Sequence, residues 1–163
     1  MRNEQNRNGI WGIVRWIALG LLIVLVASRF TGSRVSSTPF ATVAQAVKDA
    51  AELSTMNEGD NQKVRRFFGL APENYDGILY YTPKSGLDSE EILLVKLKSL
   101  DQRETVEKAM EERKNSQANA FEGYAPDEQK MYENAVIEIR GNYLLFVSAA
   151  DPGPVREAFL TTL

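Results

Sequence analysis

A long apolar stretch near the N-terminus constrains this chain more than any other feature. Residues 10–27 carry one charged side chain, Arg15, and no polar residue occurs from Trp16 to Ala27. About 18 to 20 apolar residues cross a bilayer as a helix, whereas an amphipathic helix of a soluble domain keeps a polar face. The stretch therefore predicts a transmembrane helix at residues 10–27.

The residues at the N-terminal edge of the stretch fit this interpretation. Arg15 can extend its guanidinium to the lipid headgroups, and Trp11 and Trp16 suit the aromatic belt of a membrane interface. A cleaved signal peptide is the alternative, but Leu-Val-Ala at residues 25–27 supplies only one of the small residues that cleavage needs. We therefore expect an uncleaved membrane anchor that includes Trp11, Arg15 and Trp16.

The arginines around the stretch predict its orientation. Three arginines lie on its N-terminal side and two follow it, and the richer side stays in the cytoplasm. We therefore expect a cytoplasmic N-tail at residues 1–9 and an extracytoplasmic C-terminal part at the cell membrane. Residues 28–38 are rich in serine and threonine, which predicts a flexible tether, and residues 39–163 then form the domain.

Charge and composition exclude several kinds of function. Residues 1–34 hold five arginines and one glutamate, which leaves 14 basic and 21 acidic residues and a net charge of −7 in the remainder. We therefore expect no nucleic-acid partner, because nucleic acid needs clustered lysine and arginine. The chain has no histidine and no cysteine, which excludes Ser-His-Asp triads, Cys-His dyads and zinc sites built from either residue. We expect no cofactor and no bound metal.

Short sequence signals predict where the helices of the domain begin and end. Thr38-Pro39 predicts the start of a first helix, and Asp60 and Gly69 predict the cap and the end of a second. Asp101, with a glutamate three residues later, has the spacing of a capping box for a long helix at residues 101–119. The inner face of this helix is thin: Val106, Ala109, Met110 and the aliphatic stem of Arg113.

Four segments have the composition of strands. Residues 91–98 end in an alternation that predicts one solvent-exposed face, Gly141-Asn142 is a two-residue hairpin signal, and residues 143–148 are apolar on both faces. Short helices are expected at residues 126–133 and after 151. These elements predict an α+β fold, in which helices pack on a mainly antiparallel four-stranded sheet, preceded by one transmembrane helix. The four expected strands are residues 77–82, 91–98, 135–140 and 143–148.

Three segments of the domain form a recognisable set. They are Glu91-Ile-Leu-Leu-Val-Lys96, Phe121-Glu-Gly-Tyr124 and, as the most specific, the segment from Glu133 to Tyr143. Together they resemble a bacterial family of domains of unknown function, found in membrane-anchored proteins and lipoproteins of Gram-positive bacteria. The resemblance covers residues 40–159 and implies an envelope location. It implies no activity, so no functional residue is carried over.

Three groups of residues are candidates for binding or chemistry. Phe121, Glu122 and Tyr124 follow the long helix and could form a partner-binding loop, although burial of these aromatics in the core is favoured. Residues 57–61 are rich in oxygen ligands but lack the distal glutamate of a calcium loop, which favours a helix-capping turn. Glu90-Glu91 could belong to a carboxylate pair, but neighbours in sequence face different ways, so we interpret both as surface charge.

The anchor, the tether and the missing catalytic residue types favour one function. We expect a non-enzymatic, single-pass membrane protein whose extracytoplasmic domain binds or scaffolds an envelope protein or polymer. One alternative, drawn from the resemblance, is an accessory subunit of a membrane O-acyltransferase system that modifies cell-wall polymers. The other is a hydrolase that uses carboxylates alone.

Overall fold

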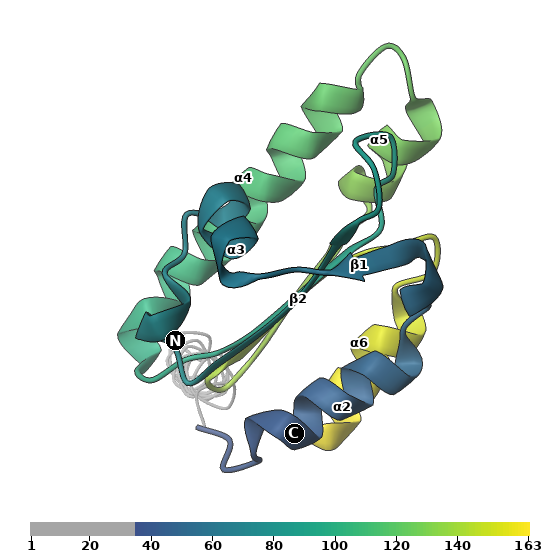
Figure 1. Ribbon diagram of the computed structural model, residues 1–163. Coiled ribbons are helices and arrows are strands. Elements are labelled where there is room, and N and C mark those ends of the chain that lie inside the picture. Colours follow the sequence, from purple (N-terminus) through teal and green to yellow (C-terminus); the bar gives the residue numbers. More distant parts are fainter. Residues whose placement is uncertain (1–34) are drawn as a thin grey trace, which may run out of the picture. The chain divides into compact units, whose positions relative to one another are not determined.

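The computed structural model describes residues 35–163 (Figure 1). The predicted N-tail, the anchor with Trp11, Arg15 and Trp16, and most of the tether lie outside the described residues. Within residues 35–163, no helix has both the length and the apolar composition needed to cross a membrane. These residues, Val35–Leu163, form one structural unit.

A five-stranded antiparallel sheet forms the centre of the domain, where four strands were predicted. The strand order is β1-β2-β3-β5-β4, and every neighbouring pair is antiparallel. The fifth strand is β1, which pairs with the end of β2 and has only three residues, too few for a recognisable alternation. The strands are β1 (Met56–Glu58), β2 (Gly77–Pro83), β3 (Glu91–Lys96), β4 (Val136–Arg140) and β5 (Tyr143–Ser148).

Helices cover both faces of the sheet (Figure 1). On one face α2 packs beside α6, and their apolar residues join those of the strands in one core cluster. On the other face α3, α4 and α5 contribute to a second cluster. Three short 3-10 turns connect these elements, at Leu53–Thr55, Pro72–Asn74 and Leu100–Gln102. The helices are α2 (Phe40–Ala50), α3 (Asn61–Phe68), α4 (Arg103–Phe121), α5 (Pro126–Glu133) and α6 (Gly153–Thr162).

The two helix layers explain why the prediction for β3 was wrong. A solvent-exposed face was expected, but β3 lies between β2 and β5, and every residue from Glu91 to Val95 is buried. Leu93 and Val95 face the α3–α5 side, while Ile92 and Leu94 face α2 and α6. Lys96, at the end of β3, was interpreted as a mark of a solvent-exposed face. Its ammonium instead donates to the Thr38 carbonyl at 3.0 Å.

The predicted helix ends are partly confirmed. Asp60 caps α3 by accepting from the Lys63 N–H at 2.8 Å, and Gly69 ends it in the left-handed conformation with φ of 67°, which glycine adopts at little cost. The capping box before α4 was misplaced. It is formed by Ser99 and Gln102 around the preceding 3-10 turn, so the cap lies two residues before the predicted Asp101.

The end of the predicted tether is attached to the domain. The Ser36 N–H donates to the Asn142 side-chain oxygen at 2.9 Å, and the Tyr143 hydroxyl donates to the Thr38 carbonyl at 2.7 Å. Thr38 was expected to cap the first helix, but α2 begins at Phe40 with no side-chain cap. The Thr38 hydroxyl instead donates to the Thr162 carbonyl at 3.4 Å, which ties this segment to the end of α6.

Candidate binding site at Arg113

A buried carboxylate lies at the start of β3, against the α3–α5 helix layer. Glu91 is 0% exposed. The Tyr80 hydroxyl donates to its Oε1 at 2.5 Å, and the Tyr132 hydroxyl donates to its Oε2 at 3.0 Å. The Arg113 Nε donates to both oxygens, at 3.2 and 3.1 Å. Both carboxylate oxygens are therefore satisfied, as a buried charge requires.

The elements around Glu91 place its partners by simple geometry. Tyr80 pairs with Leu93 across β2 and β3. Glu91 lies two residues from Leu93 and so on the same face of the sheet, which puts it diagonal to Tyr80. Arg113 lies three residues after Met110 on the inner face of α4, where its aliphatic stem was predicted to lie. Tyr132 lies on α5 and its side chain reaches Glu91. The network thus joins β2, β3, α4 and α5.

Arg113 is held by aromatic rings as well as by Glu91. Its guanidinium carbon lies 4.6 Å from the centre of the Phe67 ring and 5.9 Å from that of Phe68, both on α3. Its side chain is 10% exposed. Burial opposes the charge, but the Glu91 carboxylate outweighs that effect and the pKa of Arg113 is raised. The orientation of the guanidinium is therefore fixed before any ligand arrives.

A pocket of about 350 Å³ opens beside Arg113. α3 and α4 form two sides of it, and the loop between β2 and β3 forms the third. Two further cations line it, Lys63 on α3 and Lys84 on the loop, and within residues 35–163 neither ammonium takes part in an ion pair. The polar lining also includes Thr82, Ser85, Asp88 and Gln117.

One acidic side chain lines this pocket, but it is already engaged. Asp88 accepts from both the N–H and the hydroxyl of Ser85, each at 2.9 Å. These bonds close the loop between β2 and β3 into a turn. The carboxylate therefore shapes one wall of the pocket, while Lys63 and Lys84 form no ion pair within residues 35–163.

The prediction that Glu90 and Glu91 are both surface charges was wrong for Glu91. Glu90 is partly exposed, whereas Glu91 is fully buried and carries the network. The sequence analysis did not predict that Tyr80, Glu91 and Tyr132 come together. One signal was present: Arg113 lies on the inner face of a helix, and a guanidinium there needs a buried acceptor. Nothing in the sequence indicated which carboxylate supplies it.

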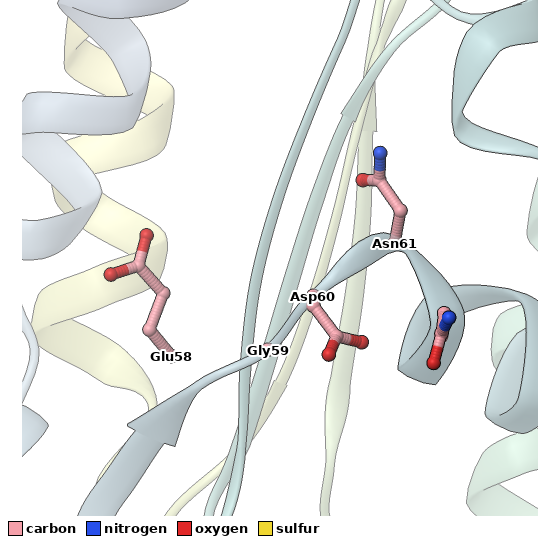
Figure 2. A pocket seen from close by; sticks show the side chains of 5 residues that line it. Glu58, Gly59, Asp60 and Asn61 are labelled. Atoms are coloured by element: carbon pink, nitrogen blue, oxygen red, sulfur yellow. The ribbon is translucent and has the colours of Figure 1, made fainter.

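Residues 57–61 run from the end of β1 through Gly59 and Asp60 into the first residue of α3, and Asp60 is the helix cap that was favoured over a calcium loop. Figure 2 shows the carboxylates of Glu58 and Asp60 pointing in different directions around an open depression, so they do not converge on a common point. The Asp60 carboxylate caps α3. No group of three or more acidic, histidine or cysteine side chains that could hold a metal ion occurs in the described part of the chain.

The end of α4 and the loop that follows it divide into a buried and an exposed part, because α4 extends two residues beyond the predicted Asn119 and includes Phe121. Phe121 is 2% exposed and stacks on Tyr132 with ring centres 6.0 Å apart, so the favoured core interpretation is confirmed for this residue. Tyr124 is 59% exposed, and Glu122 is exposed beside it. Their role in partner binding stays a prediction, and Tyr124 is the aromatic that a partner could reach.

Gly59 keeps Tyr80 in place to reach Glu91. Its N–H donates to the Tyr80 carbonyl at 2.8 Å, and a Cβ at this position would overlap the Tyr80 ring. We expect Gly59→Ala to lower the free energy of unfolding by about 1–3 kcal/mol, because overpacking displaces the ring. Gly86→Ala is the matched control, since a Cβ there meets no atom within 4 Å. Equal stability of the two variants in urea denaturation would contradict this role.

Three buried tyrosines predict how the domain responds to alkali. Burial, reinforced by Glu91, raises the pKa of Tyr80 and of Tyr132, and burial, with Asp76, raises the pKa of Tyr143 to about 12. The pKa of tyrosine in the unfolded chain is about 10, so the stability that these hydroxyls contribute is complete below pH 10. The contribution of Tyr143 is lost as the pH rises through 12, and those of Tyr80 and Tyr132 fall above pH 10 as well. The other tyrosines of the chain, Tyr75, Tyr81 and Tyr124, are replaced by phenylalanine so that only these three hydroxyls report. Tyrosinate absorbance of that variant should rise together with the loss of circular dichroism. A rise without unfolding would contradict the prediction.

The fold and the pocket together define a class: an α+β domain with a five-stranded antiparallel sheet between two helix layers. The chain belongs to the family described as Domain of unknown function (DUF4358), whose model matches residues 49–149, more than half of the chain. This confirms the resemblance to a family of domains of unknown function. Searches among curated proteins and among solved structures found no significant match.

Proposed function

We infer that this protein is a non-enzymatic, membrane-anchored binding domain that holds a partner of the cell envelope at the pocket beside Arg113. The observation that carries the proposal is the arrangement of Arg113 itself. Its guanidinium is oriented by Glu91 and Phe67 and lines an open pocket. Such preorganisation lowers the entropic cost of binding.

The sequence supplies the location in this proposal. The apolar stretch at residues 10–27 supports a single-pass anchor in the cell membrane, and the arginine distribution supports a domain outside the cell. The tether is short, since eleven residues reach at most roughly 35 Å when fully extended, so the start of the domain stays near the membrane surface. The partner is therefore a protein or polymer of the envelope.

Location and partner can be tested in the same cells. Protease treatment of intact cells should remove the domain of the full-length protein while a cytoplasmic marker survives. A photo-crosslinking residue at Gln117, which lines the pocket, should give a discrete adduct. The same residue at Glu157, exposed on α6 and outside the pocket, is the matched control.

Two outcomes would overturn the proposal. A domain that resists protease until the cells are lysed would contradict the extracytoplasmic location. Adducts that form equally from Gln117 and Glu157 would contradict the pocket as the binding surface. An adduct with a membrane O-acyltransferase would support the narrower function of an accessory subunit in modifying cell-wall polymers.

A further inference from the structure

We propose that the pocket beside Arg113 is an anion site, which takes a carboxylate or phosphate group attached to a small polar unit. The proposal rests on the proposed function only in taking this pocket as the place where a ligand binds. It goes further in naming the chemical group that is recognised and the atoms that receive it.

The unused donors of Arg113 carry the argument. A guanidinium has five N–H donors, and Nε uses its hydrogen on Glu91. Within residues 35–163, no hydrogen bond joins Nη1 or Nη2 to another protein atom. The Arg113 side chain is 10% exposed, and within the described residues Nη1 and Nη2 are not among the buried atoms that lack a partner. Both terminal nitrogens therefore reach solvent, and their four donors are open to an incoming acceptor.

The surroundings of the guanidinium leave one direction for that acceptor. Its Nε edge meets Glu91, and one of its faces meets the Phe67 ring at 4.6 Å. Arg113 also lines the pocket. The terminal nitrogens are therefore the part of the side chain that meets the pocket. Two parallel N–H groups of one arginine match the two oxygens of a carboxylate or a phosphate.

The charge around the pocket favours an anion over a cation. Glu91 offsets Arg113, and Asp88 is engaged with Ser85, which leaves Lys63 and Lys84 on two different walls. Counting these five groups, the site carries one positive charge in excess. The domain as a whole has a net charge of −7 and therefore repels anions. A local excess of positive charge is what would attract an anion to this pocket.

The size and the other walls of the pocket bound the rest of the ligand. About 350 Å³ is more than a single phosphate or carboxylate fills, so the site has room for a sugar or glycerol unit. Phe67 and Pro83 supply apolar walls, while Thr82 and Gln117 supply hydrogen-bonding groups. A phosphorylated polyol or a uronic acid, free or within a polymer, has this combination of groups.

The test uses the full-length protein in a neutral detergent, labelled with nitrogen-15. Glycerol 3-phosphate, glucuronate and inorganic phosphate are titrated at constant ionic strength, with glycerol and glucose as neutral controls. We expect saturable shifts of the Ser85, Gly86 and Gln117 amides with the anions and none with the neutral compounds. The first two probes separate a phosphate source from a carboxylate source.

Variants show whether the named cations cause the binding. Arg113→Lys keeps the charge but loses the paired donors, and should weaken binding about tenfold or more. If that variant does not fold, Lys63→Gln with Lys84→Gln, both away from the buried network, should still weaken binding severalfold. Lys130→Gln, exposed on α5 and outside the pocket, is the matched control.

The outcomes separate this inference from the proposed function. No saturable shift with any of the three anions, or equal weakening by Lys130→Gln, would overturn the anion site even if a partner crosslinks at Gln117. Anion binding that depends on Arg113 or on the two lysines would establish the site even if the crosslinking in cells finds no partner.

Discussion

Replacing Arg113 with leucine should lower the free energy of unfolding by about 3–5 kcal/mol, the largest effect expected of a single charged residue in this domain. The cost arises because Glu91, which is 0% exposed, would lose its counter-ion while its carboxyl group stays buried. The two tyrosine hydroxyls still donate to it, but neutral donors do not offset the loss of solvation. Urea denaturation followed by circular dichroism measures the change.

A second substitution separates this mechanism from a general loss of packing. Adding Glu91→Gln to Arg113→Leu removes the buried charge, while the amide oxygen can still accept from a tyrosine hydroxyl. We expect the double variant to be more stable than Arg113→Leu alone. If the double variant is less stable, the ion pair is not the source of the cost, and the aliphatic stem of Arg113 is the more important part.

The same network shows where sequence reasoning succeeded and where it stopped. The order of the helices and the four longer strands was predicted, because caps, turns and apolar periodicity are local signals. Asp60, Gly69 and Gly141-Asn142 each fix a boundary that the structure confirms. These residues act on their immediate neighbours, so a single sequence is enough to interpret them.

The predictions failed where a residue's role depends on distant parts of the chain. Glu91 was interpreted as surface charge because its burial depends on Arg113 and Tyr132, which follow 22 and 41 residues later. β3 was given a solvent-exposed face because sequence alone does not show that helices cover both faces of the sheet. The candidate binding site is assembled entirely from such long-range contacts, so its residues could not be grouped beforehand.

The end of α4 and the loop after it offer a matched pair of substitutions for separating core residues from binding residues. Phe121→Ala should lower the free energy of unfolding by about 3–5 kcal/mol, because it leaves a cavity beside Tyr132 in the core. The ring is 2% exposed and lies 6.0 Å from the Tyr132 ring. Loss of this neighbour would also loosen the support of the Tyr132 hydroxyl that binds Glu91.

Tyr124→Ala should change the free energy of unfolding by no more than about 0.5 kcal/mol, since 59% of this residue is exposed. Its ring centre lies 5.7 Å from that of Phe121, so the two substitutions remove neighbouring aromatic rings. A partner that binds there should be lost from crosslinked adducts in Tyr124→Ala while the domain keeps its stability. If Tyr124→Ala is as destabilising as Phe121→Ala, the exposed ring also belongs to the core, and Tyr124 is not a free contact for a partner.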